Sequence, residues 1–157
     1  MAVGRIKMIK KNYKFGFDIW GLILFLIIML PNFIWFAVSA PNDVLRAESV
    51  TKVADTIGSV CQVVMVAALC AIMHKERKKL SITPLIIVVI GCCLLYYLCW
   101  SLYYTGMANA GVILGMTVAP CLVFLFFALD RKNWIALIPI GVFTVCHVIF
   151  GVVNFVV

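Results

Sequence analysis

The order of apolar and polar residues divides the chain into five long hydrophobic stretches joined by short polar connectors. A membrane-spanning helix needs about 20 apolar residues, because each residue rises about 1.5 Å and the hydrocarbon layer is about 30 Å thick. Backbone polar groups in lipid must be paired within their own segment, so every stretch is predicted to be helical. The predicted spans are residues 17–38, 50–73, 82–104, 111–129 and 134–157.

These stretches predict an all-α, polytopic integral membrane protein, a compact bundle of five transmembrane helices in a single domain of residues 1–157. The connector 41–51 carries Asn42, Asp43 and Ser49, which are good helix caps and predict a short extra helix or an extension of the second span. Pro31, Pro120 and Pro139 lie inside spans, where each removes a backbone donor and favours a bend.

Composition supports the membrane interpretation. Hydrophobic residues make up 66% of the chain and charged residues 12%, whereas soluble domains average about 45–50% and about 25%. A domain of this size in water could not hide so much apolar surface. The net charge of +7 lies in the connectors, not on a surface with interleaved aromatic residues, so nucleic acid is not expected as a partner.

The basic residues also predict an orientation. Eleven of the thirteen Lys and Arg residues would lie on one side of the membrane, before the first span, between the second and third, and between the fourth and fifth. Basic connectors stay in the cytoplasm, so the N-terminus is predicted to be cytoplasmic and the C-terminus outside. The first stretch is too long for a cleavable signal, and the short loops favour a multi-pass protein of a prokaryotic plasma membrane.

The sequence contains few residue patterns that indicate catalysis. All seven cysteines lie in apolar stretches without metal-ligand spacing, and no nucleophile elbow, zinc-binding helix or phosphate loop is present. Neither a metal nor another cofactor is expected, and a non-enzymatic role is favoured. One enzymatic alternative is an acid–base pair of Asp55 and His147.

Polar residues at membrane depth identify candidate binding residues, because they are costly in lipid unless they face the protein interior. Asp55 and His147 are the two ionisable ones. Helical spacing places each in a polar stripe, with Thr51, Gly58 and Gln62 beside Asp55 and with Thr144, Gly151 and Asn154 beside His147.

If the two stripes face each other, aromatic residues of the third span would complete a polar and aromatic cavity that opens to the outside, where Asp55 could pair with His147. The alternative is that these polar groups only join helices by hydrogen bonds, each worth about 0.6 kcal/mol. The predicted ligand-binding residues are Asn32, Asp55, Gln62, Tyr96, Trp100, Tyr103, His147 and Asn154.

Small residues at Gly111, Gly115 and Ala119 form a ridge on the fourth span that lets another helix approach closely. The favoured function is therefore the binding, and conceivably the transport, of a small or lipophilic ligand. The alternative is a non-catalytic accessory subunit that acts through helix contacts. The expected partners are the lipid bilayer, a small-molecule or lipid ligand, and either a second copy of the chain or another membrane protein.

Overall fold

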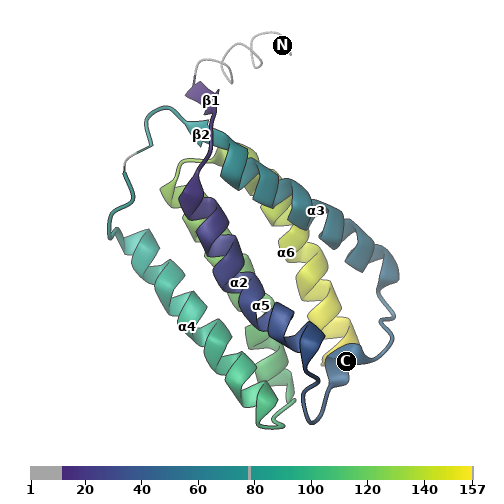
Figure 1. Ribbon diagram of the computed structural model, residues 1–157. Coiled ribbons are helices and arrows are strands. Elements are labelled where there is room, and N and C mark those ends of the chain that lie inside the picture. The colour runs from purple at the N-terminus through teal and green to yellow at the C-terminus, as the bar shows by residue number, and fades with distance from the viewer. Residues whose placement is uncertain (1–11, 78, 157) are drawn as a thin grey trace.

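The computed structural model describes residues 12–77 and 79–156. Within them five long α-helices run up and down the molecule, each long and apolar enough to cross a membrane (Figure 1). Their limits lie within a few residues of the predicted spans. The helices are α2 (Ile19–Ala37), α3 (Lys52–Ala71), α4 (Pro84–Tyr104), α5 (Ala110–Asp130) and α6 (Trp134–Phe155). Val157, the last residue of the predicted fifth span, and the basic residues Arg5, Lys7, Lys10, Lys11 and Lys78 lie outside the described residues.

Side-chain caps determine where four of these helices begin. Each cap accepts a hydrogen bond from a backbone N–H of the first turn, which has no partner within the helix. Asp18 caps α2, Thr83 caps α4, Asn109 caps α5 and Asn133 caps α6. These polar residues lie at the ends of the apolar stretches, which is why hydrophobicity alone predicts the helices well.

The contacts among the five helices form a closed ring. In Figure 1, α4 and α3 lie on opposite sides, α6 lies next to α3, and α2 crosses in front of α5. Helix α4 packs on α5, α5 on α6, and α6 on α3, while α2 contacts both α3 and α4. The connector between α3 and α4 therefore crosses one end of the bundle, and each of the other connectors joins neighbouring helices.

Two short elements lie outside the long helices. Strand β1 (Tyr13–Phe15) pairs antiparallel with β2 (Ile72–His74) at the end where α2 begins. Hydrophobicity extends the second span to residue 73, but α3 ends at Ala71 because the next residues form this strand. At the opposite end, the 3₁₀ helix η1 (Val44–Arg46) is the short helix that the caps of the connector predict.

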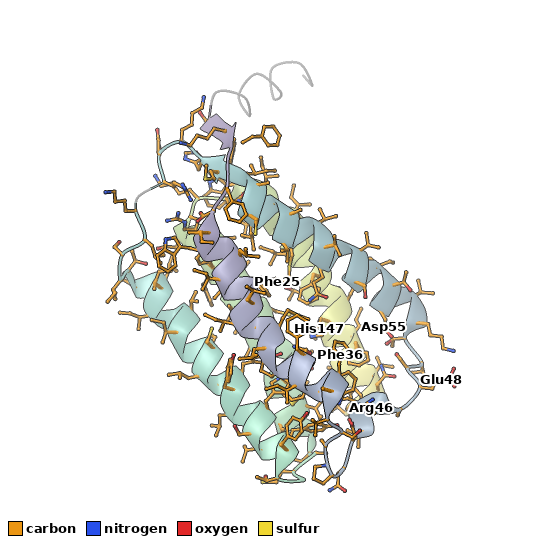
Figure 2. The ribbon with its side chains drawn as sticks, viewed as in Figure 1. Phe25, Phe36, Arg46, Glu48, Asp55 and His147 are labelled. Carbon is orange, nitrogen blue, oxygen red and sulfur yellow. The ribbon has the colours of Figure 1, made fainter. Side chains whose placement is uncertain are left out.

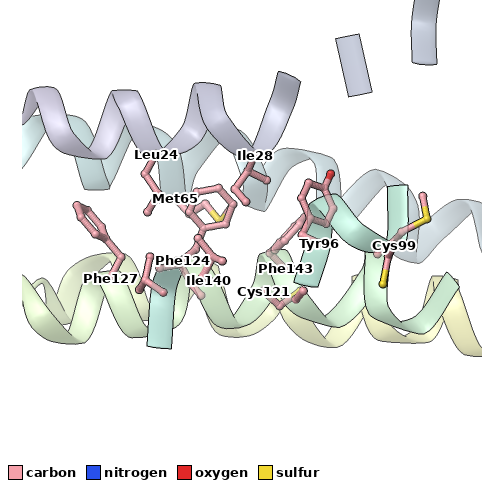
Figure 3. Close-up of a cluster of buried hydrophobic side chains, with 14 of the residues drawn as sticks. Leu24, Ile28, Met65, Tyr96, Cys99, Cys121, Phe124, Phe127, Ile140 and Phe143 are labelled. Carbon is pink, nitrogen blue, oxygen red and sulfur yellow. The ribbon is translucent and has the colours of Figure 1, made fainter. Parts of the chain in front are cut away.

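Buried apolar side chains from all five helices form one core cluster along the bundle, and Figure 3 shows part of it. Phe124 and Met65 are almost fully buried, on α5 and α3. Small residues bring the backbones together: a Cβ at Gly151 of α6 would lie 2.7 Å from Thr117 Oγ1 of α5. Many large apolar residues of α2, α3 and α4 instead face outward, which is the arrangement expected of helices that cross a membrane.

Candidate functional site

A cavity of about 260 Å³ lies among the five helices, in the half of the bundle that ends at η1. We call it the inner cavity. Most of its wall is apolar or aromatic, with a few polar groups, which is the composition of a small-molecule site. Leu45 of η1 contributes to the wall toward the connector, and Phe36, which is 65% exposed, borders the opening on the side. The lining also includes Met29, Asn32, Trp35, Gln62, Tyr96, Trp100, Met116, Thr117, His147 and Phe150.

Tyr96 and Trp100 supply hydrogen-bond donors to this cavity. Asn32 Nδ2 donates to the Tyr96 hydroxyl at 2.8 Å and to the Ile28 carbonyl at 3.2 Å. The Tyr96 oxygen thus accepts one bond and keeps its own proton for another partner. The Trp100 indole N–H lies near Tyr96 but meets no acceptor with hydrogen-bond geometry, although the side chain is only 5% exposed. A buried N–H without an acceptor costs about 1–3 kcal/mol.

His147 and Gln62 form the wall between the inner cavity and a second one. The His147 ring stacks on Phe143 at 4.9 Å and on Phe150 at 6.1 Å, so aromatic contacts fix its orientation on α6. Gln62 Nε2 lies 3.7 Å from the sulfur of Met29. Figure 2 shows His147 in the interval between α2 and α3, close to Phe36.

The second cavity, which we call the side cavity, has a volume of about 220 Å³ and lies between α3 and α6. Asp55 and His147 both line it, as do Gln62 and the exposed Ser59. The two predicted polar stripes therefore face each other. Among the described residues, however, no hydrogen bond or ion pair joins Asp55 to His147, and Asp55 Oδ1 accepts from Thr51 Oγ1 at 2.9 Å.

Two of the predicted binding residues lie away from both cavities. The Asn154 side-chain oxygen accepts from the Val50 N–H at 2.9 Å, and its Nδ2 donates to Thr51 Oγ1 at 2.9 Å. These bonds join the end of α6 to the start of α3. Tyr103 is fully buried, and its hydroxyl donates to Asp43 at 2.9 Å and accepts from the Leu45 N–H at 3.2 Å. Both residues therefore hold helix ends and connectors in place.

Asp43 connects several segments at the η1 end. Its carboxylate accepts from Trp35 Nε1 at 2.8 Å, from the Tyr103 hydroxyl, and from Arg46 Nε at 2.7 Å. We call Trp35, Asp43, Arg46 and Tyr103 the connector cluster. Burial alone would raise the pKa of Asp43, but the bonds from Trp35, Arg46 and Tyr103 outweigh burial and lower that pKa below its ordinary value.

The small-residue ridge of α5 packs within the chain. A Cβ at Gly115 would lie 2.3 Å from Cys99 Sγ of α4, and Ala119 is 1% exposed. Gly111, at the start of α5, is exposed. The central part of the ridge is thus already occupied by α4.

Sequence reasoning identified five of the residues that line the inner cavity, which are Asn32, Gln62, Tyr96, Trp100 and His147. It did not identify Trp35, Thr117 or Phe150, because apolar and weakly polar residues inside an apolar stretch carry no signal of which face they occupy. It also assigned Asp43 only a capping role. Comparison of the chain with models of protein families, with curated proteins and with solved structures finds no match.

Proposed function

We propose that this chain is a multi-pass protein of the plasma membrane that binds a small, neutral, lipophilic molecule in the inner cavity. Among the described residues, no aspartate, glutamate, lysine or arginine lines the cavity, so a charged ligand would lose its hydration without compensation. In this proposal the N-terminus is cytoplasmic, which places the inner cavity and η1 in the outer half of the bilayer. The basic connectors support that orientation.

The observation that carries the proposal is the Trp100 N–H, which is buried against the cavity and meets no acceptor with hydrogen-bond geometry among the described residues. The Tyr96 hydroxyl proton, adjacent to it, has no acceptor among the described residues either. A ligand with a carbonyl or ether oxygen would satisfy these donors, while Phe36, Trp35 and Phe150 would contact its apolar part. We therefore infer a ligand with one hydrogen-bond acceptor on a flat apolar body.

Asp55 and His147 would act indirectly in this scheme. His147 stands in the shared wall, so the orientation of its ring sets the width of the inner cavity, and Asp55 faces the same ring from the side cavity. Gln62 would orient a ligand through its amide. Transport would require the wall to open, and binding alone requires no such step.

The test compares two probes of matched shape, 2-acetylnaphthalene and 2-isopropenylnaphthalene, by thermal unfolding of the detergent-purified protein. A ligand that binds only the folded state raises the unfolding midpoint. We expect the ketone to bind about fivefold more tightly, since one neutral hydrogen bond contributes about 1 kcal/mol. Trp100→Phe keeps an aromatic ring but removes the N–H, so this variant should show a smaller preference for the ketone, with the Tyr96 hydroxyl as the remaining donor.

Trp134→Phe is the matched control, because Trp134 is 57% exposed and lies at the far end of the bundle. It should retain the preference for the ketone. Equal binding of the two probes by the unaltered protein would contradict the proposal, as would an undiminished preference for the ketone in Trp100→Phe.

A further inference from the structure

Another pocket, of about 530 Å³, lies at the end of the bundle where α2 begins, far from the inner cavity and the side cavity. We call it the cationic pocket. It is formed by the start of α2, the connector between α3 and α4, and the residue that follows α5. Its polar residues are Asp18, Arg77, Lys79 and Arg131, and its apolar residues are Phe17, Ile19, Trp20 and Leu80.

Positive charge exceeds negative charge in this pocket. Asp18 is 4% exposed, and its Oδ2 accepts from Arg131 Nη2 at 2.9 Å and from Arg77 Nη1. One carboxylate thus faces two guanidinium groups, and Lys79 adds a third cation. Two other acids lie outside this pocket: Glu76 pairs with Lys132, and Asp130 accepts from the Thr83 hydroxyl and lines a neighbouring pocket with Arg77 and Lys79. The pocket therefore has two positive charges that no carboxylate of its lining balances.

The ion pairs to Asp18 also fix the positions of the Arg77 and Arg131 guanidinium groups. Arg131 is only 6% exposed and is held by Asp18 through both Nε and Nη2. Arg77 is partly exposed, and Lys79 is exposed. Guanidinium groups offer several donors in a fixed fork that matches the oxygens of a phosphate. A phosphate in the pocket would find one immobilised cation and two accessible ones.

Exposed apolar side chains border the same pocket. Phe17, just before the cap of α2, is 63% exposed, and the first two residues of the helix, Ile19 and Trp20, are 47% and 44% exposed. This end of the bundle is where the apolar helix surface gives way to the polar connectors, and tryptophan favours that interface. An occupant that suits both parts of the pocket carries a negative headgroup and an apolar tail.

We propose that the cationic pocket binds the headgroup of an anionic phospholipid from the leaflet on the side of the N-terminus. The phosphate contacts Arg77 and Lys79 beside the fixed Arg131, and the acyl chains lie along Phe17, Ile19 and the outer surface of α2. This inference uses only the membrane insertion stated under the proposed function. It is independent of the ligand in the inner cavity.

The experiment measures binding of phosphatidylglycerol and phosphatidylcholine to the detergent-solubilised protein by native mass spectrometry. The unaltered protein should retain phosphatidylglycerol preferentially. Each basic residue near an anionic headgroup contributes about a fivefold increase in affinity. Lys79→Gln should thus weaken phosphatidylglycerol binding about fivefold, and Arg77→Gln with Lys79→Gln roughly 25-fold, with phosphatidylcholine binding unchanged.

Lys52→Gln is the matched control, since it removes one exposed lysine at the opposite end of the bundle. It should leave phosphatidylglycerol binding unchanged. If the double variant unfolds in phosphatidylcholine alone, the single variant Lys79→Gln is the test of lipid binding, because Lys79 is exposed and has no ion pair among the described residues.

Three results would overturn the proposal. The first is equal retention of the two lipids by the unaltered protein. The second is an undiminished preference for phosphatidylglycerol in the variants. The third is full displacement of phosphatidylglycerol by millimolar inorganic phosphate, which would indicate a site for a soluble anion. Flotation with phosphatidylcholine vesicles tests membrane insertion separately, and the naphthalene probes test the inner cavity, so failure of one proposal is distinguishable from failure of the other.

Discussion

At the scale of single residues, Asp43 shows how one carboxylate fixes a connector. It accepts hydrogen bonds from Trp35, Arg46 and Tyr103, which come from α2, η1 and α4. The Arg46 guanidinium also lies 4.8 Å from the centre of the Trp35 ring and donates to the Trp35 carbonyl. The connector thus stays against the end of the inner cavity, where Leu45 forms part of the wall.

The lowered pKa of Asp43 predicts a pH dependence of stability. The folded state holds this pKa below the ordinary value of 3.8, so the carboxylate contributes stability above about pH 4 that is lost as the pH falls through the folded-state pKa. Asp43→Asn should cost about 1.5–3 kcal/mol at neutral pH, as charge-assisted bonds are lost. Thermal unfolding from pH 7 to pH 3 should show the gap between the two proteins narrowing.

Glu48→Gln serves as the comparison for Asp43, because the Glu48 side chain is 82% exposed and its one ion pair among the described residues is with the exposed Lys52. Such surface pairs contribute about 0–1 kcal/mol, so this variant should follow the unaltered protein at every pH. A gap for Asp43→Asn that stays constant down to pH 3 would show that the charge of Asp43 has no role.

A second residue-scale prediction concerns the contact of α5 with α6. A Cβ at Gly151 would meet three atoms of Thr117, the nearest at 2.7 Å, and a β-branched side chain in a helix cannot turn away easily. Gly151→Ala should therefore destabilise the protein by about 1–3 kcal/mol. Gly141→Ala is the control in the same helix, where nothing lies within 4 Å. Its thermal midpoint should hold or rise, because alanine favours helix.

At the scale of elements, Asn133 connects the start of α6 to the end of α3. Its oxygen accepts from the Ala136 N–H, and its Nδ2 donates to the carbonyls of Ala68 and Ile72 at 3.0 and 2.8 Å. The side chain is 2% exposed. Its position as a helix cap could be predicted from the sequence. The two bonds to α3 could not, because they depend on which helices become neighbours.

Asn133→Asp separates the two roles, since aspartate still caps the helix but cannot donate. A carboxylate facing two carbonyls should lower stability by at least about 2 kcal/mol. Asn109→Asp provides the control: Asn109 caps α5 through its oxygen, and its amide has no acceptor among the described residues. Equal unfolding midpoints of the two variants in detergent would show that the bonds to α3 contribute nothing.

The helices and strands also show which structural features could be predicted from sequence patterns. The helices follow from long apolar stretches with polar caps, since burial in lipid leaves few other structures. The pairing of β1 with β2 involves three residues on each side, too few for a pattern of alternation. The stripes with Asp55 and His147 indicate which faces of α3 and α6 meet. Tyr103 has the same helical spacing as Tyr96 and Trp100, so its spacing predicts the same cavity. Its hydrogen bond to Asp43 depends on the course of the connector, which the spacing does not give.

At the scale of the whole molecule, the distribution of basic residues predicts the topology. A C-terminal fusion of alkaline phosphatase should be active and a C-terminal fluorescent protein dark, because the former needs the outside and the latter the cytoplasm to mature. Fusions placed after residue 79 should give the reverse. Activity of both reporters at one position would indicate a mixed orientation and contradict the prediction.

The side opening of the inner cavity at Phe36 has a consequence for measured affinities. The exposed face of α2 beside it is apolar, so in the proposed function a ligand would enter from among the lipid tails and not from water. Its occupancy is then set by the mole fraction of ligand in the membrane. Doubling the amount of lipid at constant total ligand lowers the mole fraction of ligand in the membrane. A compound that partitions strongly into lipid will therefore show an apparent dissociation constant that rises in proportion to the lipid added.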